Sequence, residues 1–191
     1  MNRTFANFTE TADNQRALQH AKRYAEKFDE MMPNGGNPPR IEKNGLLLTG
    51  SYGTGKTHLA ASIANELMAR GKTVICMTMI DMLGKIKSSF ERRELHEDEI
   101  MDKYKQVQLL IIDDLGSEQP SEWGICKIYT IVNARYEAYM PTIFTTNYGG
   151  TELINRMTPP KGGDPRNAEK TVDRINEMCG CFAISGRSWR R

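Results

Sequence analysis

The sequence predicts an α/β fold, in which helices cover both faces of a parallel β-sheet. Two observations carry this prediction. Five β-rich runs alternate with helical segments along the 191 residues. One of these runs, LLII at 109–112, has four aliphatic residues in succession and would bury both of its faces, as strands of covered parallel sheets do. The chain is long enough for one domain with a sizeable core.

Periodicity assigns the elements in order. Apolar residues at helical spacing, such as Ala17, Leu18, Ala21 and Tyr24, predict the first helix. The expected helices cover 13–28, 57–70, most of 80–106, 121–139, 151–157 and 166–179. Short apolar and β-branched runs predict strands at 46–50, 73–79, 108–113, 141–147 and 181–185. The segments 31–45 and 158–165 are rich in Pro and Gly and are expected to be loops.

The composition narrows the classes of function. A net charge of +2 is too small to imply a polyanionic partner by itself, so any nucleic-acid surface would have to be local. No apolar run approaches the roughly 18–20 residues that span a bilayer, and residues 1–10 lack the apolar core of a signal peptide. The four cysteines form no CxxC pair, which favours free thiols over a zinc site. We therefore expect a cytoplasmic protein without a membrane partner.

Residues 50–57, GSYGTGKT, match the phosphate-binding pattern G-x-x-x-x-G-K-[ST] and lie between an expected strand and an expected helix. Glycines let backbone N–H groups turn around phosphates, and the helix N-terminus adds its positive dipole end. Lys56 is expected to reach the β- and γ-phosphates of ATP, and the Thr57 hydroxyl to ligate Mg²⁺. The predicted nucleotide-binding residues, for ATP or ADP, are Gly50, Ser51, Tyr52, Gly53, Thr54, Gly55, Lys56, Thr57 and His58.

Two adjacent carboxylates, Asp113 and Asp114, follow the aliphatic run. Like charges this close disfavour joint ionisation, and a bound cation offsets that cost. Asp113 is therefore expected to hold Mg²⁺, directly or through water, and Asp114 to polarise the attacking water as a general base. The next expected strand, 141–147, ends in TTN, which predicts that the amide of Asn147 orients this water.

Together these residues resemble the AAA+ ATPases, and more narrowly the DnaC/DnaI/IstB group of bacterial helicase loaders and transposition helpers. GSYGTGKT is similar to that group's Walker A motif, LLIIDDLG to its Walker B motif and TIFTTN to its sensor 1, while RTFANF resembles the group's entry into the ATPase domain. The resemblance implies a P-loop NTPase of the AAA+ (ASCE) type, with three α/β/α layers and a five-stranded parallel sheet in the order 5-1-4-3-2. We expect a single ATPase domain over 1–191. A missing C-terminal helical lid suits this group, whereas the missing N-terminal helicase-binding domain is a departure from its usual pattern.

Three arginines gain roles from the resemblance. TVDRI is similar to the segment that carries the arginine finger, which implies that Arg174 neutralises charge on the phosphoryl group in a neighbouring subunit. A solvated helix residue is the alternative for Arg174. GRSWRR resembles the group's closing G-x-S-Y-R, so Arg190 would contact phosphate or a subunit interface. Arg135 matches a motif position as well, and a salt bridge on a helix surface fits it equally.

Residues 80–106 lie between the second strand and the Walker B strand and are highly charged. DnaA and its loader relatives place extra helices here, which line the path of single-stranded DNA in the assembled ring or spiral. The resemblance implies salt-sensitive phosphate contacts by Lys85, Lys87, Arg92 and Arg93. Acidic residues crowd the same segment, so a solvated charged helix pair stays open as the alternative.

The function that these motifs imply is a Mg²⁺- and ATP-dependent ATPase of the helicase-loader type. It would self-assemble when ATP-bound and engage single-stranded DNA and a replicative helicase. One alternative is an IS21-type transposition helper, which serves a transposase on target DNA. A nucleotide-dependent binding module with little turnover fits too, because Asp114 is one methylene shorter than the Glu of many AAA+ proteins. A P-loop kinase is disfavoured by the acid pair on the third strand and by Asn147, and a GTPase by the sequence TTNY at 145–148, which supplies no N-K-x-D motif.

Overall fold

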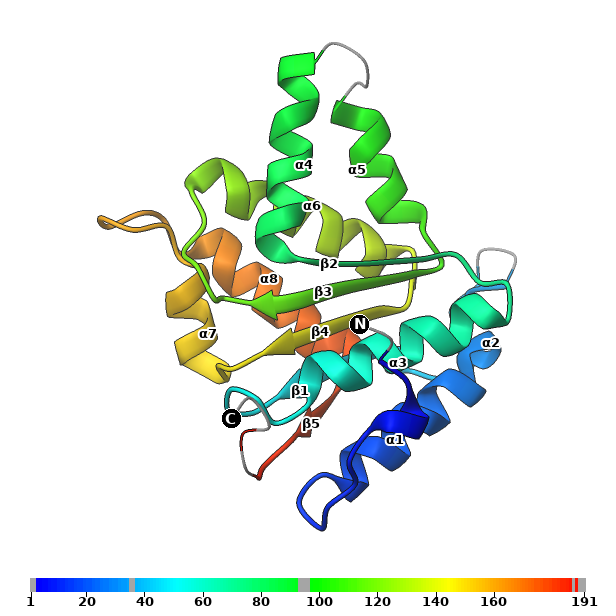
Figure 1. The fold of residues 1–191 in the computed structure, drawn as a ribbon. Coiled ribbons are helices and arrows are strands. Elements are labelled where there is room, and N and C mark those ends of the chain that lie inside the picture. Colours follow the sequence, from blue (N-terminus) through cyan, green and yellow to red (C-terminus); the bar gives the residue numbers. More distant parts are fainter. Residues whose placement is uncertain (1–2, 35–36, 93–96, 187, 189–191) are drawn as a thin grey trace.

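The structure is a computed structural model that describes residues 3–34, 37–92, 97–186 and 188 (Figure 1). In this part of the chain one parallel sheet is formed by β1 (Gly45–Thr49), β2 (Val74–Thr78), β3 (Leu109–Leu115), β4 (Thr142–Thr146) and β5 (Cys179–Ala183). Their spatial order, β2-β3-β4-β1-β5, is the expected 5-1-4-3-2 read from the opposite edge, so the predicted fold class is confirmed. The carboxyl ends of β1, β3 and β4 meet at one edge of the sheet, which is where α/β folds bind ligands.

Helices cover both faces of the sheet, and each face has its own apolar cluster (Figure 1). Successive residues of β3 alternate between the faces: Leu109 and Ile111 pack with one set of helices, Leu110 and Ile112 with the other. The first set comprises α1 (Gln15–Glu26), α2 (Phe28–Met31) and α3 (Lys56–Ala69). The second comprises α4 (Met79–Arg92), α5 (Glu97–Gln106), α6 (Glu122–Glu137), α7 (Gly150–Met157) and α8 (Arg166–Met178).

Three local features differ from the periodic pattern. The helix expected at 13–28 is broken at Lys27 (φ −95°, ψ 13°) into α1 and α2, although Phe28 stays buried. β3 continues to Leu115, past the expected end at 113, so the acid pair lies inside the strand. A short 3-10 helix, η1 (Phe5–Asn7), leaves no periodic signal in the sequence and lies beside α3. The other elements begin and end within two residues of their predicted bounds.

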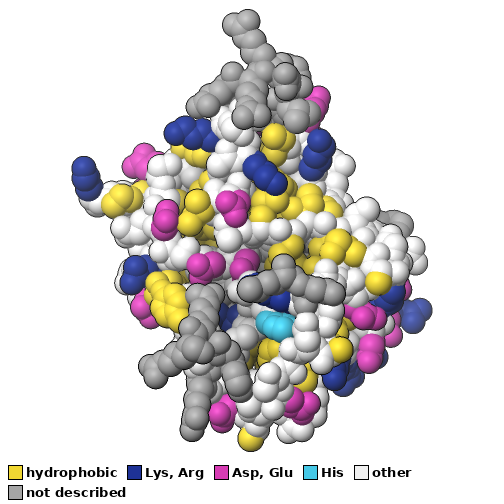
Figure 2. Space-filling model, in the orientation of Figure 1, with side chains coloured by type: hydrophobic (Ala, Val, Ile, Leu, Met, Phe, Trp, Pro, Cys, Tyr) yellow, Lys and Arg dark blue, Asp and Glu magenta, His cyan; other side chains and the backbone are white. Residues whose placement is uncertain are grey.

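The helices α4 and α5 form a hairpin that projects beyond the sheet (Figure 1). Lys85 and Lys87 are exposed on α4, whereas Arg93 and the side chain of Arg92 lie outside the described residues. On the face shown in Figure 2, basic and acidic side chains are interspersed around the hairpin. The predicted DNA contacts therefore stay a prediction. Among the described helices, none combines the length and apolarity that crossing a bilayer requires.

Arg135 on α6 does not form the surface salt bridge that its helical position allowed. Its side chain is 0% exposed, and within the described residues it pairs with no carboxylate. The guanidinium instead donates hydrogen bonds of 2.6–3.0 Å to oxygens of Tyr104, Lys105, Val107, Pro141 and Thr142. Burial lowers the pKa of Arg135 to about 9, so the side chain keeps its charge at neutral pH. The side chain therefore ties the end of α5 to the start of β4.

Candidate nucleotide-binding site

The phosphate loop connects β1 to α3 and turns sharply at its glycines. Gly53 (φ 77°) and Gly55 (φ 105°) both adopt left-handed backbone that other residues avoid. A Cβ atom at Gly53 would lie 2.2 Å from the Ser188 hydroxyl oxygen, and one at Gly55 would lie 2.8 Å from the Phe8 ring. The loop therefore needs glycine for space as well as for conformation. The turn aims the N-terminus of the 14-residue α3 at the cavity described below, an arrangement that attracts anions.

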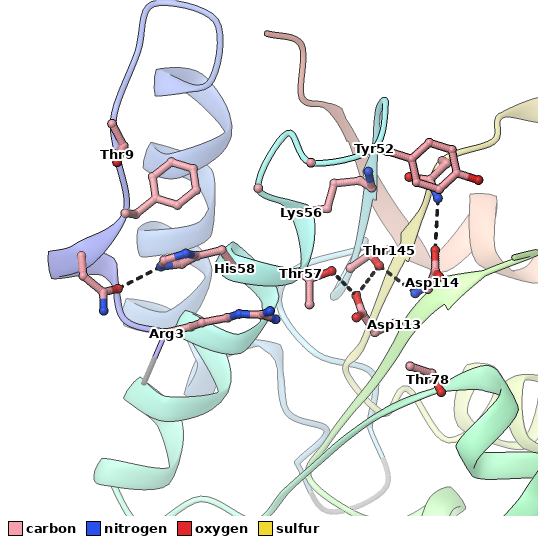
Figure 3. Close-up of a pocket in the computed structure, with 15 residues that line it drawn as sticks. Arg3, Thr9, Tyr52, Lys56, Thr57, His58, Thr78, Asp113, Asp114 and Thr145 are labelled. Atoms are coloured by element: carbon pink, nitrogen blue, oxygen red, sulfur yellow. Dashed lines mark hydrogen bonds between the residues drawn. The ribbon is translucent and has the colours of Figure 1, made fainter. Parts of the chain in front are cut away.

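Lys56, the first residue of α3, folds back over the loop (Figure 3). Its ammonium donates to the carbonyl oxygens of Gly50 at 2.8 Å and Ser51 at 2.7 Å, and the residue is only 6% exposed. The Thr54 hydroxyl also donates to Ser51 O, at 3.0 Å. These contacts hold the lysine charge inside the curve of the loop, where a phosphate group would lie.

Asp113 is brought together with Thr57, its predicted partner for Mg²⁺. The Thr57 hydroxyl donates to Asp113 Oδ1 at 3.0 Å, across 56 positions of sequence (Figure 3). The Thr145 hydroxyl donates to the same oxygen at 2.5 Å. A hydroxyl and a carboxylate are hard oxygen donors, so this set fits Mg²⁺. The sequence contained Thr145 as the polar end of a strand, but nothing in the pattern indicated its contact with the acid.

Asp114 is brought together with Asn147, as the strand order predicts. The Asn147 amide donates to Asp114 Oδ1 at 3.1 Å, and the Asp114 backbone N–H donates to the Thr145 hydroxyl at 2.9 Å. The pairing of β3 with β4 shifts register between Ile112 and Leu115, and Asp114 has φ 58°. This bulge lets two consecutive carboxylates line one cavity while each is held by a different partner.

A cavity of about 650 Å³ opens in front of these groups. Its described lining includes Lys56, Thr57, Asp113, Asp114 and Asn147, together with residues of the N-terminal segment that the sequence reasoning did not assign: Arg3, Asn7, Phe8 and Thr9. The RTFANF motif covers Arg3, Asn7 and Phe8, and its resemblance to the family predicted no role for them. The cavity is therefore walled on one side by a segment about fifty residues distant in the chain.

His58 and Tyr52, both predicted to bind nucleotide, line the cavity and also contact other parts of the protein. His58 Nε2 lies 3.0 Å from Thr4 O and 3.0 Å from Asn7 Oδ1, so it fastens the N-terminal segment to α3. Tyr52 is 57% exposed, and its hydroxyl lies 3.0 Å from that of Tyr148. This hydrogen bond raises the pKa of Tyr148 and joins the phosphate loop to the residue after Asn147.

Arg174 is not among the described residues that line the cavity, and neither are Gly50, Ser51 and Thr54 of the phosphate loop. Arg174 lies on α8, where it donates to Asn133 Oδ1 at 3.2 Å and Glu177 Oε2 at 2.9 Å. Its guanidinium also stacks on Tyr136, 4.6 Å from the ring centroid. Arg190 lies outside the described residues. The role of Arg174 in a neighbouring subunit stays a prediction.

The sheet order, the phosphate loop and the acid pair on β3 define a P-loop NTPase of the AAA+ class. The chain belongs to the family of IstB-like ATP binding proteins, which it matches over residues 40–191. It is 32% identical over 157 residues to the replicative helicase loader DnaC of Escherichia coli K12, an alignment that covers 82% of this chain and 60% of DnaC. It is 27% identical over 149 residues to the replicative helicase loader DnaI of Bacillus subtilis, with 76% of this chain and 47% of DnaI covered.

Solved structures agree with this assignment. A crystal structure of the DnaC helicase loader superimposes with a TM-score of 0.76 at 25% identity and covers 96% of this chain and 97% of that one. The replication initiator DnaA, bound to AMPPCP and single-stranded DNA, gives a TM-score of 0.74 at 23% identity over 97% of this chain and 50% of that one, which shows a shared fold. The chain spans about 60% of the length of the E. coli DnaC that it matches.

Proposed function

We propose that this chain is a Mg²⁺-dependent ATPase that acts as a replicative helicase loader. The observation that carries the proposal is the convergence of Thr57, Asp113, Asp114 and Asn147 at the carboxyl edge of the sheet, beside the phosphate loop. Relatives named as replicative helicase loaders support the choice of partner. The similarity of the fold to DnaA bound to single-stranded DNA supports engagement of a single strand.

The two carboxylates have separate tasks in the proposed reaction. Thr57 and Asp113 would hold Mg²⁺, which would supply positive charge to stabilise the negative phosphate oxygens. Asp114, positioned by Asn147, accepts a proton from the attacking water. The water oxygen bonds to the γ-phosphorus, and the bond from that phosphorus to the β–γ bridging oxygen breaks, which yields ADP and phosphate. Lys56 contributes positive charge at the β- and γ-phosphates.

The nucleotide assignment is tested with three variants in ATP-binding and phosphate-release assays. Lys56→Ala should abolish tight ATP binding, and the exposed Lys22→Ala on α1 should leave it unchanged. Asp114→Asn should keep ATP binding and slow phosphate release by about 10²–10⁴-fold, the usual contribution of a general base. Wild-type affinity in Lys56→Ala would refute the site. Negligible turnover in the wild-type protein would favour the binding module over the enzyme.

A transposition helper is the second candidate, because the family match itself is to IstB-like proteins. Both candidates share the ATPase core and differ in the protein that they serve. Purified chain should be mixed with the host's replicative helicase, or with a transposase, in ATP and in ADP. Retention of the helicase in ATP supports the loader. Retention of the transposase alone would replace it with the transposition helper.

A further inference from the structure

Residues 3–9, here called the N-terminal strap, lie along the outer wall of the nucleotide cavity (Figure 3). Three polar contacts fasten the strap to α3. The Asn65 amide donates to Arg3 O at 2.6 Å, and His58 Nε2 contacts Thr4 O and Asn7 Oδ1. The Phe8 ring packs edge-on against His58, with 5.2 Å between ring centroids. The Asn65 hydrogen bond therefore holds the backbone of Arg3 itself, and the His58 contacts hold the strap that follows it.

The Arg3 side chain leaves the strap and enters the cavity. Figure 3 shows it extending from the strap toward the side of the cavity where Thr57 and Asp113 lie. Other arginines, such as Arg135 and Arg174, are bound to carbonyl or carboxylate oxygens. The Arg3 guanidinium forms no hydrogen bond or ion pair with a residue that the structure describes. A half-buried guanidinium held over a cavity with its donors unused is suited to an oxyanion ligand.

The balance of charges in the cavity also indicates that a cationic side chain besides Lys56 faces the phosphates. Apart from His58, its described lining carries two positive side chains, Lys56 and Arg3, and two negative ones, Asp113 and Asp114. The ammonium of Lys56 is shared with the loop carbonyls. In the proposed reaction Mg²⁺ is held beside Asp113, so Arg3 is left to face the remaining negative charge of the phosphates.

The position of Arg3 along the cavity indicates which phosphates it meets. Asp114 and Asn147 mark the end at which the γ-phosphate is attacked. In Figure 3, Arg3 enters from the side of His58, with Asp113 between it and Asp114. We infer that Arg3 is a phosphate-binding residue, and that it contacts the phosphates that ATP and ADP share and not the γ-phosphate. This inference rests on the proposed nucleotide site.

Arg3→Gln is the test, with Arg3→Lys and Arg16→Gln as matched variants. Removing the guanidinium should weaken the binding of ATP and of ADP equally, by about tenfold or more, since charged hydrogen bonds of this type are usually that strong. The KM for ATP should rise while kcat is unchanged, because the contact is the same before and after γ-phosphate transfer. Arg3→Lys keeps the positive charge but loses the planar set of guanidinium donors. Its affinity for nucleotide should therefore lie between those of the wild type and Arg3→Gln. Arg16, exposed on α1 away from the cavity lining, should be replaceable without effect.

Titration of fluorescent ATP and ADP analogues, and unfolding without nucleotide, give the decisive readings. An equal loss for both nucleotides, with an unchanged unfolding midpoint, supports the inference. A loss for ATP alone would assign Arg3 to the γ-phosphate and overturn it, as would unchanged affinities. A lower midpoint in the absence of nucleotide would show that Arg3 acts by holding the strap, and would also overturn it. If the wild-type protein bound no nucleotide, the proposed function would fail before Arg3 is considered.

Discussion

Replacing Arg135 with methionine tests whether one buried cation holds the α4–α5 hairpin to the sheet. The change leaves four carbonyl oxygens and the Thr142 hydroxyl without their donor. A hydrogen bond from a charged donor contributes about 1.5–3 kcal/mol, but such bonds are not additive and water reaches some of the freed oxygens. Each buried acceptor left without a donor costs about 1–3 kcal/mol, and two of the freed carbonyls, those of Tyr104 and Pro141, are in hydrogen bonds buried from water. We therefore expect Arg135→Met to lower the free energy of unfolding by about 3–5 kcal/mol.

Urea denaturation measures this loss as a lower midpoint with an unchanged slope. Amide hydrogen exchange shows where in the chain the stability is lost. Three of the five hydrogen bonds of Arg135 end in the last turn of α5 or just after it. The amides of α5 should therefore exchange faster, while those of α3 change little. Arg166→Met is the control, because Arg166 is exposed and, among the described residues, pairs only with Asp164. This variant should stay within about 0.5 kcal/mol of wild type. A loss below about 1 kcal/mol in Arg135→Met, or equal acceleration in α3 and α5, would refute the reasoning.

Three further variants address assembly, DNA and pH. Arg174→Ala should lose most ATP turnover alone and regain part of it when mixed with Lys56→Ala subunits, which supply an intact arginine; no recovery at any ratio would rule out a role in trans. Changing Lys85 and Lys87 to Glu should weaken single-strand binding and flatten its salt dependence by about one unit of slope per lost contact, whereas equal binding across a salt series would favour a solvated helix pair. Burial, then two neighbouring arginines of α1, lower the pKa of His20. As the pH falls, His20 is therefore protonated in the unfolded chain before it is protonated in the folded one. The free energy of unfolding should be highest above about pH 6.5 and should decrease as the pH drops below that value. Urea midpoints at pH 7.5 and 5.5 should converge in His20→Gln.

The local sequence pattern predicts those parts of the candidate site that lie within a short stretch of the chain. The phosphate loop, the acid pair and Asn147 each follow from a strand end or a helix start, and the structure places all three at one edge of the sheet. The sheet order came only from the family resemblance, because periodicity does not say which strands are neighbours. Arg135 and the N-terminal strap could not be predicted, since both depend on contacts between distant positions, such as the pair formed by His58 and Thr4.

The left-handed backbone at Asp114 bears on why the second acid is short. At φ 58°, Asp and Asn are the non-glycine residues that the backbone accepts most readily, since their short side chains bond locally. A glutamate at this position would gain a methylene of reach, yet would sit in a conformation that costs about 1–2 kcal/mol and would displace the carboxylate from the Asn147 amide. Asp114→Glu should therefore lower the rate of the proposed ATP hydrolysis, measured as phosphate release, and not raise it. In the proposed mechanism, the left-handed main chain at Asp114 therefore limits the length of the acid that activates water.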